Sequence, residues 1–105
     1  MIARLWHGWT SKANADAYEA LLRREIPSAT RGLGGFRGAR VLRREAPPAE
    51  VEFVTMLFFD SMNAVRGFAG DDFETAVLMP GAAELLTRYD QRSAHYSTAF
   101  ELPGE

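Results

Sequence analysis

Two histidines are the side chains of this sequence best suited to proton transfer near neutral pH. His7 and His95 are the only histidines among the 105 residues, and each lies beside an aromatic residue in a segment with strand character. A lone imidazole in such a place can act as a general base when a ligand lies within reach. It can equally be an interior histidine bonded to a neighbour, so both roles stay open.

The spacing of these histidines does not favour a metal centre. Neither has a second ligand at the close spacing of a metal-binding motif. The chain has no cysteine, which excludes disulfides, thiolate metal ligands and a cysteine nucleophile. The serines lack the Gly-x-Ser-x-Gly context of a nucleophile elbow. We therefore expect neither a metal nor a cofactor.

Aromatic rings offer a second kind of site. A flat aromatic ligand could be enclosed by rings, although a small core uses the same side chains for packing. We expect two or three rings to line a pocket and the others to belong to the core. The candidates are Trp6, Trp9, Tyr18, Phe58, Phe68, Phe73 and Tyr96.

Two further motifs have a structural explanation. The glycines between 32 and 35 follow a predicted helix and precede a predicted strand, whereas a phosphate loop requires the opposite order. They therefore predict a turn. The arginines between 31 and 44 fall on both faces of a predicted strand, with Glu45, Glu50 and Glu52 across a hairpin. This pattern favours solvated ion pairs over a stripe that binds an anion or RNA.

Composition places the chain among ordinary globular proteins. It is 47% apolar and 25% charged, with a net charge of −2, and Lys12 is its only lysine. Such a balance gives no reason to expect nucleic acid or a membrane as a partner. No signal peptide is visible, and no run approaches the roughly 20 apolar residues that span a bilayer. We expect a cytoplasmic protein.

The elements that must position these residues follow from hydrophobic periodicity and from capping residues. Strands are predicted over 2–10, 36–45, 51–59 and 94–100. A first helix follows Ser11 or Asn14 and should end or kink at Pro27. A second helix follows Asp60 or Ser61 and ends at Gly70. A third is predicted from Pro80 to Tyr89, and 71–79 stays unassigned.

This order predicts an α+β, ferredoxin-like split βαβ fold, with helices on one face of a four-stranded antiparallel sheet. We expect one domain over 1–100 and a flexible tail over 101–105. Bulky rings occur on both faces of the first strand, which indicates a central strand covered on both sides. No element remains to cover the second face, so we expect a homodimer with a two-fold axis. One face carries Ala3, Leu5, His7 and Trp9, and the other carries Ile2, Arg4, Trp6 and Gly8.

Several segments resemble small bacterial members of the antibiotic biosynthesis monooxygenase family, whose members form dimeric α+β barrels. The likeness extends over about residues 2–100. It rests on Ile2 to Gly8, Gly35 to Arg44, Val51 to Thr55, Asp60-Ser61, Phe68 to Asp72 and His95-Tyr96.

The resemblance implies a cofactor-independent monooxygenase that acts on a small aromatic or quinol-like metabolite. The known enzymes of the family bind an electron-rich phenol in an apolar pocket and stabilise its anion, which passes an electron to oxygen. This chemistry requires one base and hydrogen-bond donors aimed at the oxyanion. The implied base is His7 or His95, and the implied donor is Tyr96. The implied substrate-binding rings are Trp6, Trp9, Phe68 and Phe73.

Two departures from the family pattern bear on activity. Anthrone oxygenases of the family use a tryptophan on the second helix, where this chain has Phe68. Haem-degrading relatives need a histidine ligand soon after that helix, and this chain has Leu78 near that position and no histidine between Phe68 and Arg92. We therefore do not expect haem degradation. The missing tryptophan favours the alternative of a non-catalytic dimer of the same fold that binds small molecules or is associated with stress.

Overall fold

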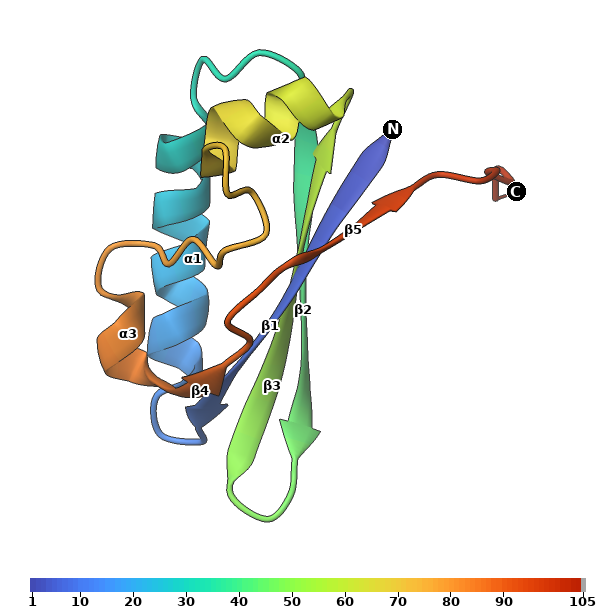
Figure 1. Ribbon diagram of the computed structural model, residues 1–105. Coiled ribbons are helices and arrows are strands. Elements are labelled where there is room, and N and C mark those ends of the chain that lie inside the picture. The colour runs from blue at the N-terminus through green and yellow to red at the C-terminus, as the bar shows by residue number, and fades with distance from the viewer. Residues whose placement is uncertain (105) are drawn as a thin grey trace.

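An antiparallel sheet forms one layer of the molecule and the helices form the other (Figure 1). The computed structural model describes residues 1–104. The strand order is β2-β3-β1-β4, and β5 pairs with another part of β1. The elements are β1 (Ile2–Ser11), α1 (Ala15–Thr30), β2 (Phe36–Ala46), β3 (Glu50–Phe59), α2 (Met62–Ala69), α3 (Ala82–Leu85), β4 (Leu86–Tyr89) and β5 (Ala94–Ser97). The predicted α+β, ferredoxin-like fold with an antiparallel sheet is confirmed, but the described residues form a five-stranded sheet where four strands were predicted.

Strand β1 lies at the centre of the sheet, as its rings on both faces predicted. It pairs with β3 on one side and with β4 and β5 on the other. Arg4, Trp6 and Thr10 are buried beneath the helices, whereas His7 and Trp9 on the opposite face are half-buried. That opposite face, which we call the open face, carries no further element of residues 1–104 (Figure 1).

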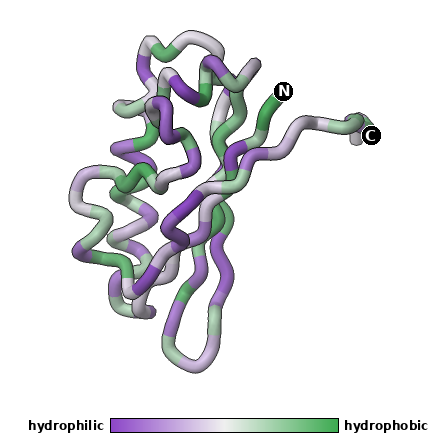
Figure 2. The backbone as a smooth tube through the Cα atoms, viewed as in Figure 1, coloured by the Kyte–Doolittle hydropathy of each residue, from purple (hydrophilic) through white to green (hydrophobic). Residues whose placement is uncertain are grey.

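The core lies between α1 and β3. Tyr18, Leu22 and Ile26 recur at helical spacing on α1 and are buried against the sheet. The ring of Tyr18 meets the ring of Phe53 edge-on, with 4.9 Å between the centroids. Burial of each such side chain stabilises the fold by about 1.5–3 kcal/mol. Hydrophobic positions accordingly alternate with hydrophilic ones along the helices and strands (Figure 2).

Pro27 does not end the first helix, so the first of the two expected outcomes, an end or a kink, is wrong. Helix α1 continues to Thr30, so Pro27 lies in its last turn. A proline there removes a single intrahelical N–H bond. The hydroxyl of Thr30 donates to the carbonyl of Ile26 at 2.8 Å, one turn earlier in the helix.

The predicted helix over 80–89 is wrong in its second half. Only Ala82–Leu85 is helical, and Leu86–Tyr89 forms β4. Gly8 and Trp9 of β1 pair with Tyr89 and Arg88. The second edge of β1 must find backbone partners, and this requirement outweighs the helical spacing of Leu86 and Tyr89. The last predicted strand is also shorter, because β5 ends at Ser97.

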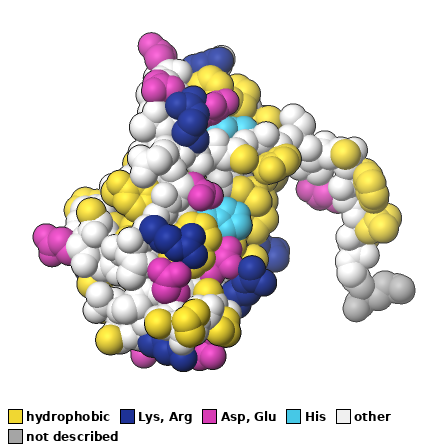
Figure 3. All heavy atoms as spheres, turned by 60° about the horizontal axis from the view of Figure 1, so that its bottom comes forward, with side chains coloured by type: hydrophobic (Ala, Val, Ile, Leu, Met, Phe, Trp, Pro, Cys, Tyr) yellow, Lys and Arg dark blue, Asp and Glu magenta, His cyan; other side chains and the backbone are white. Residues whose placement is uncertain are grey.

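The arginines of β2 form ion pairs, but not mainly across the hairpin. Arg44 binds Glu52 at 2.7 Å, as predicted, whereas Glu50 pairs with Arg88 of β4. Arg43 reaches Asp16 on α1 at 3.1 Å. Basic and acidic side chains lie interspersed on the face that Figure 3 shows. No helix of residues 1–104 is long and apolar enough to cross a membrane.

The glycine cluster forms the predicted turn between α1 and β2. Gly35 adopts a φ of 81°, and a Cβ added there would lie 2.6 Å from the Cβ of Ala64. The backbone of Asp60 donates to the carbonyl of Gly35 at 2.8 Å. Gly35 therefore lets α2 approach this turn closely.

We expect Gly35→Ala to lower the free energy of unfolding by about 2–4 kcal/mol, because left-handed strain and overlap with Ala64 act together. Gly32→Ala is the matched control, since Gly32 has a φ of 71° but nothing within 4 Å of an added Cβ. It should cost only the backbone strain, about 1–2 kcal/mol. Urea unfolding at one protein concentration measures both. Equal losses in the two variants would contradict the close approach of α2.

Candidate functional site

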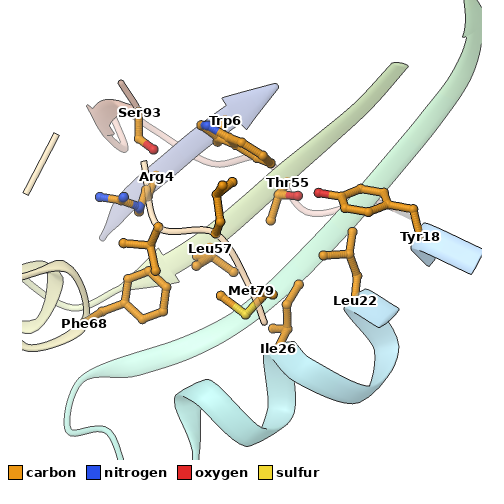
Figure 4. A pocket seen from close by; sticks show the side chains of 12 residues that line it. Arg4, Trp6, Tyr18, Leu22, Ile26, Thr55, Leu57, Phe68, Met79 and Ser93 are labelled. Carbon is orange, nitrogen blue, oxygen red and sulfur yellow. The ribbon is translucent and has the colours of Figure 1, made fainter. Parts of the chain in front are cut away.

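A cavity of about 40 Å³ lies between the sheet and the helices (Figure 4). Strands β1 and β3 form one wall, and α1, α2 and the irregular segment before α3 form the others. Most of the lining is apolar. The lining residues are Arg4, Trp6, Tyr18, Leu22, Ile26, Thr55, Leu57, Phe68, Val77, Leu78, Met79 and Ser93.

Polar groups lie at two ends of this cavity. Figure 4 shows Arg4 and Ser93 at one end and the hydroxyl-bearing Thr55 and Tyr18 at the other. The Thr55 hydroxyl is buried and has no hydrogen-bond partner among the described residues. Burial raises the pKa of Tyr18, so its hydroxyl stays protonated and can donate. A ligand that fits here has an apolar body and polar atoms at its ends.

Arg4 has the most distinctive surroundings of these residues. Its guanidinium donates to the carbonyl of Phe73, to the carbonyl of Thr75 at 3.1 Å and to Nε2 of His95 at 3.1 Å. The guanidinium also lies over the ring of Phe68, 5.5 Å from the centroid. The bonds to Phe73 and Thr75 hold the segment that follows α2 against β1.

The contact with Arg4 fixes the protonation of His95. An arginine has donors only, so Nε2 of His95 must accept and the proton of the neutral ring lies on Nδ1. Burial lowers the pKa of His95, and the charge of Arg4 lowers it further. The imidazole is therefore held neutral, in the form that can accept a proton.

The cavity is small for a ligand site. About 40 Å³ is room for one or a few waters, whereas pockets for drug-sized ligands measure about 300–1,000 Å³. An aromatic ligand must therefore displace side chains. Met79 lines the cavity from an irregular segment, and methionine repacks more easily than branched residues.

Of the histidines and rings proposed from the sequence, the structure brings Trp6, Tyr18, Phe68, Phe73 and His95 to this region. Trp6 and Phe68 line the cavity, and the indole of Trp6 donates to the carbonyl of Asp90 at 2.7 Å. The rings of Phe73 and His95 meet edge-on at 5.3 Å. Both residues contact Arg4 and lie beside the cavity.

The others, His7, Trp9, Phe58 and Tyr96, lie on the open face. Nδ1 of His7 bonds the carboxylate of Glu52 at 2.8 Å. Trp9 stacks beside His7, and Arg88 lies 3.9 Å above the Trp9 ring. Tyr96 is opposite Ala3 and is 58% exposed. The sheet therefore separates His7 and Tyr96 from His95, and the predicted residues do not converge on one point.

The sequence-based selection missed Arg4, Thr55 and Ser93. One available signal was the alternation of side chains between the two faces of β1. It places Arg4 on the same face as Trp6, beneath the helices. An arginine on the covered face of a central strand is rare unless it has a partner or a role. Thr55 and Ser93 gave no comparable signal.

The lowered pKa of His95 predicts how stability depends on pH. An unfolded chain takes up this proton near pH 6.5, and the folded chain does so only at lower pH. Protonation therefore favours unfolding as the pH falls below about 6.5. We expect the His95 ring to titrate below pH 6.5 in a proton NMR titration, and His95→Gln to lose less stability than the native chain between pH 6.5 and 5. A midpoint at or above 6.5 would contradict the burial of His95 beside the charge of Arg4.

Comparison by sequence gives no relative: no protein-family model and no curated protein matches this chain. Comparison by structure gives several. A proposed antibiotic biosynthesis monooxygenase from Bacillus cereus is similar over 100% of this chain and 97% of its own, with a TM-score of 0.71 and 14% identity.

Two further structures share the fold. SnoaB, a cofactor-independent oxygenase from Streptomyces nogalater, has a TM-score of 0.60 and 18% identity, with 98% of each chain covered. A variant of MhuD with two manganese protoporphyrin IX molecules per active site has a TM-score of 0.64 and 13% identity, with 99% of this chain and 100% of that chain covered. The protein therefore has the fold of the antibiotic biosynthesis monooxygenases over essentially its whole described length.

Proposed function

We propose that the chain binds a small aromatic or quinol-like metabolite in the cavity between sheet and helices, and that it oxygenates this metabolite without a cofactor. The observation that carries the proposal is the cavity itself, with Trp6, Leu57 and Phe68 as apolar walls and polar groups at its two ends. The shared fold with a cofactor-independent oxygenase supports it.

The chemistry asks little of the protein. Removal of a proton gives a substrate anion, which passes an electron to dioxygen, and the two radicals then combine. The peroxide anion that results takes the proton back from the base. Loss of water then leaves one oxygen atom in a new carbonyl, and the substrate carbon has lost two hydrogens. The protein has to bind the ring, accept the first proton and stabilise the anion.

His95 is the proposed base. Its ring is held neutral beside the cavity, with Nε2 turned to Arg4 at 3.1 Å. To take a proton from a ligand, Nε2 must exchange this hydrogen bond for one from the substrate hydroxyl. Trp6 and Phe68 would hold the substrate ring. The opposite side of the sheet carries His7, Trp9 and Tyr96, which therefore cannot contact a ligand in this cavity.

The volume of the cavity favours a second candidate function. At about 40 Å³ it is mostly filled by side chains, which suits a non-catalytic protein that binds a small molecule after local repacking. The two functions differ in whether oxygen is consumed.

We expect oxygen uptake when simple quinols and naphthols are added, and we expect His95→Gln to lower turnover about 100-fold, as loss of a general base does. His7→Gln tests the open face. If His7→Gln loses turnover and His95→Gln does not, the active site lies on the open face instead. Ser28→Ala, at an exposed position of α1, serves as the control. Ligand binding without oxygen uptake would establish the non-catalytic function.

We also propose that a second copy of the chain covers the open face. That face carries half-buried Leu5, Val54 and Met56 and the more exposed Leu42 and Tyr96. Leu42 is 52% exposed and Tyr96 58% exposed, which is unusual for such large apolar side chains. Residues 98–104 extend away from the body (Figure 1), and Phe100 and Leu102 are 78% and 84% exposed. A face-to-face partner would remove this apolar surface from water.

We expect a dimer in sedimentation at micromolar concentration and a monomer for Leu42→Glu, because a carboxylate would be buried in the interface. Val41→Glu is the matched control, since Val41 is 37% exposed on the other face of the same strand. A monomeric native chain, or equal behaviour of both variants, would contradict a dimer through the open face.

A further inference from the structure

Arg4 is a buried cation without a buried anion. Its side chain lies beneath the helices, and the residue is 3% exposed. Its hydrogen bonds within residues 1–104 are to two carbonyls and an imidazole, and none is to a carboxylate. The nearby Glu74 is paired with Arg92 at 2.7 Å. Among the described residues, the positive charge of Arg4 is therefore compensated by the dipoles of these acceptors and by the face of the Phe68 ring, and by no carboxylate.

Burying a charge without a partner of opposite sign costs free energy, so the charge of Arg4 calls for an explanation. A buried charge normally has a partner of opposite sign, and arginine cannot lose its proton inside a protein. Fastening the carbonyls of Phe73 and Thr75 to β1 requires donors, but it does not require a full charge. A purely structural clamp therefore explains the hydrogen bonds of Arg4 and leaves its charge unexplained.

Arg4 also keeps capacity for a ligand. A guanidinium has five N–H donors, and three of them have acceptors in the described part of the chain. Arg4 lines the cavity, with Ser93 at the same end (Figure 4). The other walls there are the apolar Leu57, Phe68 and Trp6, and the Trp6 donor is already bonded to Asp90. An anion at this end would meet the guanidinium in surroundings of low polarity, where attraction between charges is enhanced.

We propose that the Arg4 end of the cavity binds an anionic oxygen, so that the ligand is an aromatic carboxylate or an ionised phenol whose ring lies among the apolar walls. This inference rests on the cavity being the ligand site, as proposed above, and does not depend on oxygenation. It assigns the ligand a charge of −1 at the atom facing Arg4. It also assigns Arg4 the role of the residue that selects anions over neutral molecules of the same shape.

Calorimetric titration with benzoate and benzamide tests this selection, because the two probes match in shape and differ in charge. We expect the native chain to bind benzoate at least about tenfold more tightly than benzamide. Arg4→Met should abolish the preference, and Arg4→Lys should keep part of it, since lysine retains the charge but not the planar donors. Arg24→Met, at an exposed arginine of α1, should leave the preference unchanged.

A second probe distinguishes the two anions. Free 4-nitrophenol ionises near neutral pH, and its anion is coloured. A site that binds ionised phenols should increase the coloured fraction when protein is added at constant pH, and Arg4→Met should abolish the increase. A benzoate preference without this colour change identifies the carboxylate as the ligand class.

Equal affinity for benzoate and benzamide in the native chain would overturn the inference, and so would a preference that survives in folded Arg4→Met. Circular dichroism shows whether Arg4→Met is folded. If it is not, the benzoate and benzamide affinities of Arg4→Lys and of the native chain test the inference instead. Failure of both probes to bind at millimolar concentration would overturn the assignment of the cavity as well. Oxygen uptake without any charge preference would support the proposed oxygenation and contradict the anion site. A charge preference without oxygen uptake would support the anion site and contradict the oxygenation.

Discussion

The need of the central strand to bury both of its faces governs this molecule. Strand β1 pairs along both edges, with β3 on one side and β4 and β5 on the other. One face, with Arg4 and Trp6, lies under the helices and supplies a wall of the cavity. The other face, with His7 and Trp9, is left half-buried. The cavity and the surface proposed for a partner are thus the two sides of one strand.

The buried cation of Arg4 connects fold and site. Its hydrogen bonds to the carbonyls of Phe73 and Thr75 hold an irregular segment over the cavity. Its contact with Nε2 of His95 adds to the effect of burial in lowering the pKa of that ring. The same guanidinium thus shapes the cavity wall, fixes the state of the proposed base and supplies the proposed anion receptor. A group with three roles in one place cannot be removed without affecting all of them, which is why charge-matched probes and Arg4→Lys are needed beside Arg4→Met.

The two candidate functions make different use of one small cavity. Oxygenation and simple binding both require a flat ligand against Trp6 and Phe68. Phe68 also packs on Phe59 in the core, with 5.8 Å between the ring centroids, so it belongs to both the core and the cavity. Met79 and the segment around it can move with less loss of packing than the helices can. Repacking in this segment would therefore set the size of ligand that either function can accept.

Hydrophobic alternation in the sequence determined the strands, the central position of β1, the hairpin of β2 and β3 and the two faces of β1, because side-chain period and turn residues are local properties. The ferredoxin-like fold followed from their order. Tertiary structure alone decided that Leu86 to Tyr89 would be a strand, because the free edge of β1 needed backbone partners. It also decided the site: His7 and His95 have similar local surroundings in sequence, but the sheet separates them. Burial and the charge of Arg4, which is 91 residues distant along the chain, together lower the pKa of His95.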